Sequence, residues 1–260
     1  MSPNTQRACS DHDADAQRRD VALVLFARRR EHRGKALGLG RANARLSKLL
    51  LEHALHTTRA AAAGRMALAV VTDEPLAEGA LAPLHGRGDD DVMQLLQQGD
   101  DFESRLLDAL RRVAARGYRR LVLVGSDTPS LASADLERAA VTDSARAVLG
   151  PCPDGGFYLL SIDSAHLDAL AGLPWRRASL YRALRQRLVA RGLAIETLTS
   201  RADLDSARDV QRAFALLDAL SRHYLARSLV DAPAAHARSG RRSDLAPRSR
   251  CDGARAPPLA

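Results

Sequence analysis

Three short segments contain carboxylates, which can bind cations, and two of them place these beside glycines, which let a phosphate approach the backbone. The first, GSDTPSL at 125–131, follows an apolar run and begins with Gly125 and Ser126 before Asp127. A carboxylate there suits a hard divalent cation, because Mg²⁺ takes one or two carboxylates together with phosphate oxygens and water. An Asx hydrogen bond that only turns the loop explains Asp127 equally well.

The second segment, LGPCPDGGFYLL at 149–160, places Asp154, Gly155 and Gly156 between two apolar runs. Such a triplet is first of all typical of a hairpin turn. It also offers a carboxylate to a sugar hydroxyl or a metal-bound water, with glycines that let a ligand lie against the backbone. Cys152 has no base nearby in the sequence, so we expect a buried or inert thiol.

The third segment, RADLDSARDV at 201–210, contains Asp203 and Asp205. They share one side of an extended stretch, because side chains alternate across a strand. Ser206 can then cap a following helix. The pair offers a second metal ligand, but acidic residues before a helix are also ordinary complements of the helix dipole.

Basic residues are concentrated in two other places. Of the formal net charge of +8, residues 28–45 contribute +6 and residues 227–260 contribute +4, so the rest is close to neutral. Aromatic residues are only 3% of the chain, too few for a row of rings that stacks on nucleic-acid bases. We therefore expect no nucleic-acid partner, and the early basic residues either contact phosphate or form a solvated arginine cluster.

Apolar runs alternate with segments of helical periodicity, which indicates an α/β sheet that is parallel or mostly parallel. The expected strands are 21–26, 66–71, 121–124, 147–149, 157–160 and 194–198. The expected helices are 42–63, a short one at 91–97, 102–116, one starting near 133, 176–191 and 206–227. Ligands of such sheets bind beyond the carboxyl ends of the strands, so we expect the loops that follow Phe26, Val124 and Leu149 to carry the site.

The organisation of the chain follows from composition. Residues 1–20 contain no apolar stretch and predict a disordered leader, residues 21–227 a single domain, and residues 228–260 a disordered basic tail. No apolar run approaches the roughly 20 residues that span a bilayer. Three scattered cysteines suggest neither a zinc site nor a disulfide framework. We expect a cytoplasmic protein.

The acidic segments occur in an order that resembles a bacterial family of glycosyltransferase-A-like transferases of unknown function, the radical-SAM/selenodomain-associated type. The resemblance extends over residues 21–214, about three quarters of the chain, and LPWRRAS at 173–179 and QGDDFESRLLDAL at 98–110 add to it. It implies the nucleotide-diphospho-sugar transferase fold, a Rossmann-like three-layer α/β/α sandwich with a mostly parallel central sheet. It also implies a nucleotide-sugar donor and an acceptor that the sequence does not identify.

The same resemblance implies roles for individual residues. Asp127 would bind Mg²⁺ or Mn²⁺ at the nucleotide diphosphate, next to Gly125 and Ser126, and Asp205 would be a second metal-contacting residue. The pocket of the donor or the acceptor would be lined by Asp154, Gly155 and Gly156, and Trp175 would border the acceptor side. Asp154 is also the candidate general base for the acceptor hydroxyl in an inverting transfer.

The sequence departs from this family in its first loop, ARRREHRGKALGLG at 27–40. The family usually has a Pro-Gly turn and a Lys-Thr-Arg-Leu motif there, of which Gly34 and Lys35 remain. Lys35 is the best remaining phosphate contact, with Arg28 and Arg33 as substitutes.

Three hypotheses about function follow. The first is a metal-dependent glycosyltransferase that uses a nucleotide sugar. The second is a nucleotidyltransferase acting on a nucleoside triphosphate and a phosphorylated small molecule, since one fold can support both reactions. The third is a non-catalytic relative that binds a nucleotide or a protein. The altered first loop favours glycosyl over nucleotidyl transfer, and it also motivates the third hypothesis.

Overall fold

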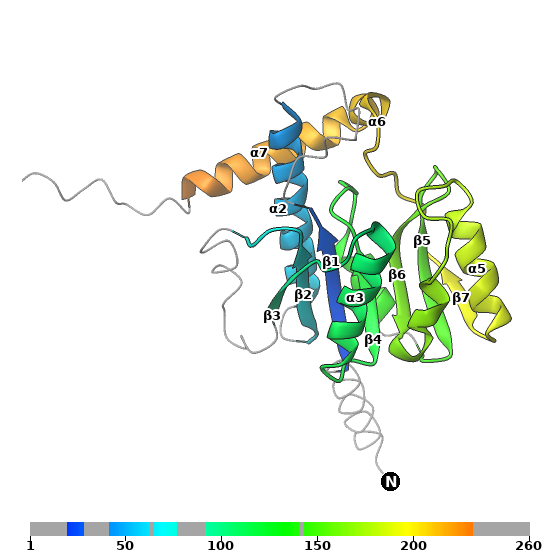
Figure 1. Cartoon of the computed structure of the whole chain (residues 1–260). Coiled ribbons are helices and arrows are strands. Elements are labelled where there is room, and N and C mark those ends of the chain that lie inside the picture. The colour runs from blue at the N-terminus through cyan, green and yellow to red at the C-terminus, as the bar shows by residue number, and fades with distance from the viewer. Residues whose placement is uncertain (1–19, 29–41, 63–64, 77–91, 141–142, 231–260) are drawn as a thin grey trace, which may run out of the picture. The chain divides into compact units, whose positions relative to one another are not determined.

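The computed structural model describes residues 20–28, 42–62, 65–76, 92–140 and 143–230 (Figure 1). The chain divides into two units, residues 1–224 and 225–260, and all that follows concerns the first. The expected leader and tail lie almost wholly outside the described residues, as do Arg33 and Lys35, so the domain boundaries stay predictions. No helix in the described ranges is long and apolar enough to cross a membrane.

The apolar runs form the centre of one seven-stranded sheet. Strands β1 (Val21–Ala27), β2 (Ala67–Thr72) and β4 (Arg120–Val124) are buried at nearly every position, as expected for strands covered on both faces. The outer strands are β3 (Val92–Leu96), β5 (Arg146–Pro151), β6 (Phe157–Asp163) and β7 (Ala194–Thr197). Their order in the sheet is β3-β2-β1-β4-β6-β5-β7.

One strand runs against the others. β6 pairs antiparallel with both β4 and β5, whereas the remaining pairs are parallel. β6 therefore begins at the edge where the parallel strands end, and the turn between β5 and β6 lies at that edge. The carboxyl edge of the sheet thus gathers the loops after β1, β4, β5 and β7, where the sequence places its candidate site.

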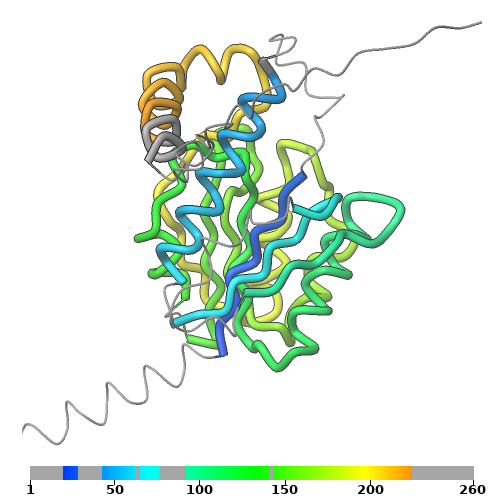
Figure 2. The backbone as a smooth tube through the Cα atoms, turned by 90° about the vertical axis from the view of Figure 1, so that its left-hand side faces the viewer, coloured from blue at the N-terminus to red at the C-terminus, as the bar shows by residue number. Residues whose placement is uncertain are grey.

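Helices cover both faces of the sheet. Helices α2 (Ala42–Ala62) and α4 (Ser133–Ala140) pack on one face, and α3 (Phe102–Ala114), the 3₁₀ helix η3 (Ser164–Leu170) and α5 (Leu180–Ala190) pack on the other. Figure 2 shows α2 and α3 on opposite sides of the strands. The predicted three-layer α/β/α sandwich with a mostly parallel sheet is therefore confirmed.

Three elements differ from the sequence-based prediction. The helix expected at 91–97 is wrong, because these residues form the edge strand β3 through parallel pairing with β2, a tertiary contact that overrides a short ambiguous pattern. The helix expected at 176–191 begins only at Leu180, after a series of turns. The helix expected at 206–227 is interrupted at Ala213, which separates α6 (Ala207–Arg212) from α7 (Phe214–Val230).

Substitution of Gly150 in β5 tests the packing of Tyr158 that supports the carboxyl edge. A Cβ atom at Gly150 would lie 2.5 Å from the ring of Tyr158, which is buried and whose hydroxyl donates to the carbonyl of Thr199. We expect Gly150→Ala to destabilise the fold by about 1–3 kcal/mol, the usual cost of overpacking. Chemical denaturation measures this free energy.

Gly125→Ala is the matched control, because its added Cβ meets no atom within 4 Å. It should leave the free energy of unfolding within about 1 kcal/mol of the wild-type value. Equal stability of the two variants would contradict the packing described for Tyr158.

Candidate functional site

The candidate site is assembled by the segment that follows β7. Two of its backbone N–H groups donate to the end of β5: Leu198 to the carbonyl of Leu149 (2.9 Å) and Arg201 to that of Pro151 (3.1 Å). The next bond runs from the N–H of Leu204 to the carbonyl of Asp127, at 3.0 Å. The three acidic segments identified in the sequence therefore lie side by side at the carboxyl edge.

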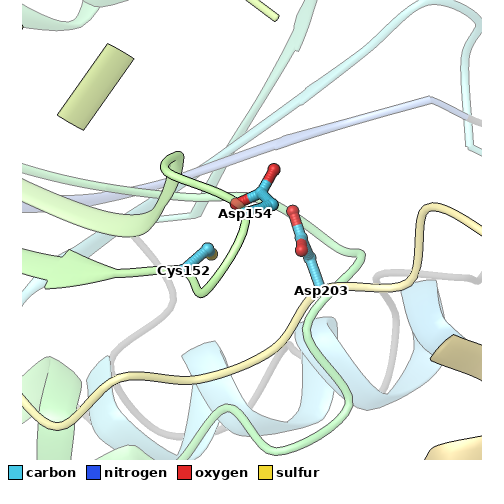
Figure 3. Close-up of side chains that lie close together, drawn as sticks. All are labelled: Cys152, Asp154 and Asp203. Carbon is cyan, nitrogen blue, oxygen red and sulfur yellow. The ribbon is translucent and has the colours of Figure 1, made fainter. Parts of the chain in front are cut away.

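Two of these segments bring three possible metal ligands together. The ligand atoms of Cys152, Asp154 and Asp203 all lie within 4.8 Å of one another. Figure 3 shows the carboxylates of Asp154 and Asp203 near one another, one from the β5–β6 turn and the other from the segment after β7. Asp154 is exposed, Asp203 is half-buried and Cys152 is buried, so the cluster opens to solvent on the carboxylate side.

The turn that holds Asp154 is fixed by its own hydrogen bonds. The N–H of Gly156 donates to Asp154 Oδ1 (2.9 Å), and the N–H of Cys152 donates to the carbonyl of Gly156 (3.0 Å). Gly155 has a φ of +91°, which favours glycine. The turn predicted for this triplet is present, and its conformation holds the Asp154 carboxylate toward Asp203.

Cys152 is buried and its thiol stays protonated. Burial raises the pKa of this thiol above its ordinary value, and the negative charges of Asp203, Asp154 and Asp205 raise it further. Only the thiolate is a nucleophile or a good metal ligand. The expectation of a buried thiol is confirmed, and the two carboxylates are the better cation ligands of the group.

The donor set fits a hard divalent cation. Mg²⁺ commonly uses one or two carboxylates and completes its shell with phosphate oxygens and water, and Mn²⁺ also prefers oxygen ligands. Asp154 and Asp203 supply two such carboxylates on a solvent-open side. The buried thiol is a soft donor and adds little for these ions.

Asp127 and Asp205, the two predicted metal ligands, are not members of this compact group. Asp127 is half-buried, its carboxylate lies 3.4 Å from the hydroxyl of Ser126, and its carbonyl is bonded to Leu204. Asp205 is exposed and precedes the cap of α6, where Ser206 and Asp209 form the predicted N-terminal cap. Asp127 is bonded through its carbonyl to the residue after Asp203, and Asp205 follows Asp203 by two residues. Neither carboxylate belongs to the 4.8 Å group.

Arg28 is the described member of the predicted phosphate-binding residues and lies on the same edge. Burial lowers the pKa of its guanidinium below the ordinary value, and the positive charges of Arg105 and Arg176 lower it further. Asp73 and Asp127 act in the opposite direction, so Arg28 lies within electrostatic reach of the predicted metal ligand Asp127.

Trp175 is held in place by a residue that the sequence analysis did not single out. Its indole Nε1–H donates to Glu103 Oε2 (2.8 Å), while the N–H of Gly172 donates to Oε1 of the same carboxylate (2.8 Å). Glu103 was inside the QGDDFESRLLDAL motif, but a glutamate in the first turn of a helix also complements the dipole, which hides such a role. Asp203 was missed as a partner of Asp154, because no sequence spacing links them.

Comparison with known proteins supports the resemblance found in the sequence. A family model described as an uncharacterized protein conserved in bacteria (DUF2064) matches residues 54–177. A crystal structure from Desulfovibrio desulfuricans G20, of a protein assigned as a nucleotide-diphospho-sugar transferase, has a TM-score of 0.60 at 23% identity and covers 79% of this chain and 98% of its own.

A second structure has the same fold at lower identity. The 4-diphosphocytidyl-2C-methyl-D-erythritol synthase of Anaerococcus prevotii DSM 20548 has a TM-score of 0.51 at 11% identity, covering 79% of this chain and 99% of its own. No curated protein matches the sequence. The resemblance to a transferase family of unknown function is thereby confirmed, and at these identities the solved structures show the fold alone.

Gly155 provides a test of how the β5–β6 turn is positioned. An added Cβ would lie 2.0 Å from the carbonyl oxygen of Ala178, and the carbonyl of Gly155 itself accepts the N–H of Tyr181 (2.8 Å). We expect Gly155→Ala to shift the turn and to destabilise the fold by about 1–3 kcal/mol beyond the cost of the positive φ. Denaturation followed by the fluorescence of Trp175, the single tryptophan of the chain, measures the change.

Gly172→Ala separates steric contact from backbone strain. Gly172 also has a positive φ, of +65°, but an added Cβ there meets no atom within 4 Å. It should cost only the roughly 1–2 kcal/mol of a left-handed residue. If both variants lose the same stability, the turn is not packed against Ala178 as described.

Proposed function

We propose, from the similarity to the DUF2064 family and the arrangement of its carboxylates, that this chain is a metal-dependent transferase that takes a nucleotide sugar as donor. The observation that supports this most directly is the approach of Asp154 and Asp203 within one 4.8 Å group at the carboxyl edge of the sheet. In open α/β sheets this edge is the usual ligand-binding position.

The carboxylates divide into a cation pair and two neighbours. Asp154 and Asp203 hold Mg²⁺ or Mn²⁺, and Asp127 and Asp205 remain proposed ligands from the adjoining segments. A cation bound there would supply Lewis-acid stabilisation of the charge on a departing diphosphate. Because Asp154 faces Asp203, we place it among the cation ligands in preference to the general base expected from the sequence.

Other residues of the edge bind and orient the substrates. Gly125, Ser126 and Gly156 offer backbone that a ligand can approach closely, since glycine and small residues leave room there. Arg28 adds positive charge near Asp127, and Lys35 and Arg33 remain proposed phosphate contacts from the undescribed loop. Trp175, positioned by Glu103, offers an aromatic face to the acceptor. Such prearranged charges account for much of catalysis in many transferases.

A thermal-shift panel tests this proposal, with nucleoside triphosphates, diphosphates and nucleotide sugars, each with and without Mn²⁺. We expect one nucleotide sugar to stabilise the protein only when Mn²⁺ is present, by about 2.7 kcal/mol at a hundredfold excess over its Kd. Stabilisation by a triphosphate instead would favour nucleotidyl transfer. If a folded sample shows no shift with any ligand, the non-catalytic hypothesis replaces the proposal.

Single carboxylate variants assign the metal ligands. Asp154→Asn, Asp203→Asn and Asp127→Asn should each remove the Mn²⁺-dependent part of the shift, because each deletes a charge that the cation requires. Asp168→Asn is the matched control, since Asp168 lies in η3, after the opposite end of β6, and is ion-paired only on the surface with Arg191. Retention of the full Mn²⁺-dependent shift by Asp203→Asn would overturn the assignment of the cation pair.

A further inference from the structure

Four of the nine aromatic residues of the chain lie together at the carboxyl edge. The ring of Phe102 lies 5.9 Å from that of Phe26 and 5.3 Å from that of Trp175, and Phe157 lies 6.2 Å from Trp175. These are three of the four phenylalanines and the single tryptophan of the sequence. They pack against the face of the sheet that α3 and α5 cover.

The aromatic cluster also brings three arginines together. Arg28 continues the strand alternation two residues beyond Phe26, and Arg105 lies one turn after Phe102 in α3. Arg176 follows Trp175 and lies over the ring of Phe102, with its Cζ 5.9 Å from the ring centroid. The three arginines are thus carried by separate segments, and Arg105 and Arg176 both lie within electrostatic reach of Arg28.

The carboxylates of the described residues do not neutralise these arginines by ion pairs. Within the described ranges, no carboxylate lies at ion-pair distance from any of the three. Arg105 donates to the carbonyls of Gly99 (3.5 Å) and Asp100 (3.3 Å), and Arg176 contacts the Phe102 ring. Burial and the positive charges of Arg105 and Arg176 lower the pKa of Arg28, although Asp73 and Asp127 act in the opposite direction.

Arg176 adopts a strained backbone conformation. Its φ is +63°, and among the described residues other than glycine it alone has a positive φ. A left-handed residue of this kind costs about 1–2 kcal/mol, and such strain occurs most often at ligand sites. A conformation that directs a third cation toward two others lowers stability unless an anion is bound between them.

We propose that Arg28, Arg105 and Arg176 bind the phosphate group of a phosphorylated small-molecule acceptor. Arginine forks match phosphate oxygens in geometry, and a dianion with three free oxygens suits three guanidinium groups better than a single carboxylate does. This assignment rests on the proposed transferase function and specifies the chemical class of its acceptor.

The position of the arginines favours the acceptor over the donor. The aromatic cluster packs on the α3 and α5 face of the sheet, whereas Cys152, beside the proposed cation ligands, packs on the α2 and α4 face. Cys152 and the aromatic cluster therefore lie on opposite faces of the sheet, and the Asp154 turn joins them at the edge, because the carbonyl of Gly155 accepts the N–H of Tyr181 in α5. Two substrates that react with each other can be held from these two sides at once.

Binding of inorganic phosphate to the full chain tests the arginine site, by calorimetry in EDTA so that no cation contributes. We expect saturable binding that weakens at least tenfold in Arg176→Gln and Arg105→Gln. Arg176→Lys should show an intermediate loss, because the charge remains without the fork. Arg185→Gln, an exposed position on α5, is the matched control and should bind as the wild type does.

Two further results separate a failure of the site from a failure of the proposed function. Asp127→Asn should bind phosphate as tightly as the wild type or more tightly, since it removes negative charge near Arg28. Absent or variant-insensitive phosphate binding in folded samples would overturn the arginine site. Should Arg105→Gln fail to fold, phosphate binding to Arg176→Gln and Arg28→Gln decides whether the arginines form the site.

Competition assigns the bound phosphate to a substrate. The nucleotide selected in the thermal-shift panel, saturating and with Mn²⁺, should leave phosphate binding in place. Mutual exclusion would show that the arginines hold the donor and would overturn the acceptor assignment. If phosphate binds and depends on the arginines while no nucleotide binds, the transferase function falls and the acceptor assignment falls with it, but the phosphate site stands.

Discussion

The hydrogen bonds between residues 198–204 and the ends of β5 and β4 determine where the acidic side chains of this protein lie. They join main-chain groups, so they hold the segment in register independently of which side chains it presents. Between Arg201 and Leu204, both of which make such bonds, Asp203 is directed to the β5–β6 turn. Without this attachment, the segment after β7 would leave the sheet and the carboxylate pair would not form.

Hydrogen bonds between side chains strengthen the same attachment. The guanidinium of Arg201 donates to the carboxylate of Asp135 in α4, and the single hydroxyl proton of Tyr158 is shared between this carboxylate and the carbonyl of Thr199. This connects α4, β6 and the segment after β7 at one point. A carboxylate that serves two donors in a partly buried place resists displacement more than a surface ion pair does. The segment that carries Asp203 is therefore held by side-chain as well as main-chain hydrogen bonds.

The sequence predicts the core strands because their patterns are unambiguous, and it fails where a pattern depends on pairing. VALVLF and LVLV are continuous apolar runs, and both form strands buried on the two faces of the sheet. Residues 92–96 are apolar at four of five positions, which fits a buried turn of helix or an edge strand, and only the pairing with β2 decides. The break at Ala213 leaves no mark in composition, because alanine favours helix.

The same distinction applies to the site. Asp127, Asp154 and Asp203 were each visible as acidic residues after an apolar run, but their pairing was not, since β6 lies between β4 and β5 in the sheet and reverses direction. Two interpretations of Asp154 that seemed to compete, a turn residue and a ligand, are compatible. One carboxylate oxygen closes the turn and thereby orients the group toward Asp203.

The scarcity of aromatic residues makes their position informative. Rings needed only for packing can lie anywhere in the core of a domain of this size. Here Phe102 and Phe157 lie beside Trp175, and Phe26 lies beside Phe102, all at the carboxyl edge of the sheet. Apolar rings there lower the local dielectric constant and thereby strengthen the electrostatic interactions of neighbouring charged groups. Carboxylates and arginines then present opposite charges next to one another along the sheet edge. Such a division of charge would let a cation-bound diphosphate and a second anion approach each other without direct repulsion.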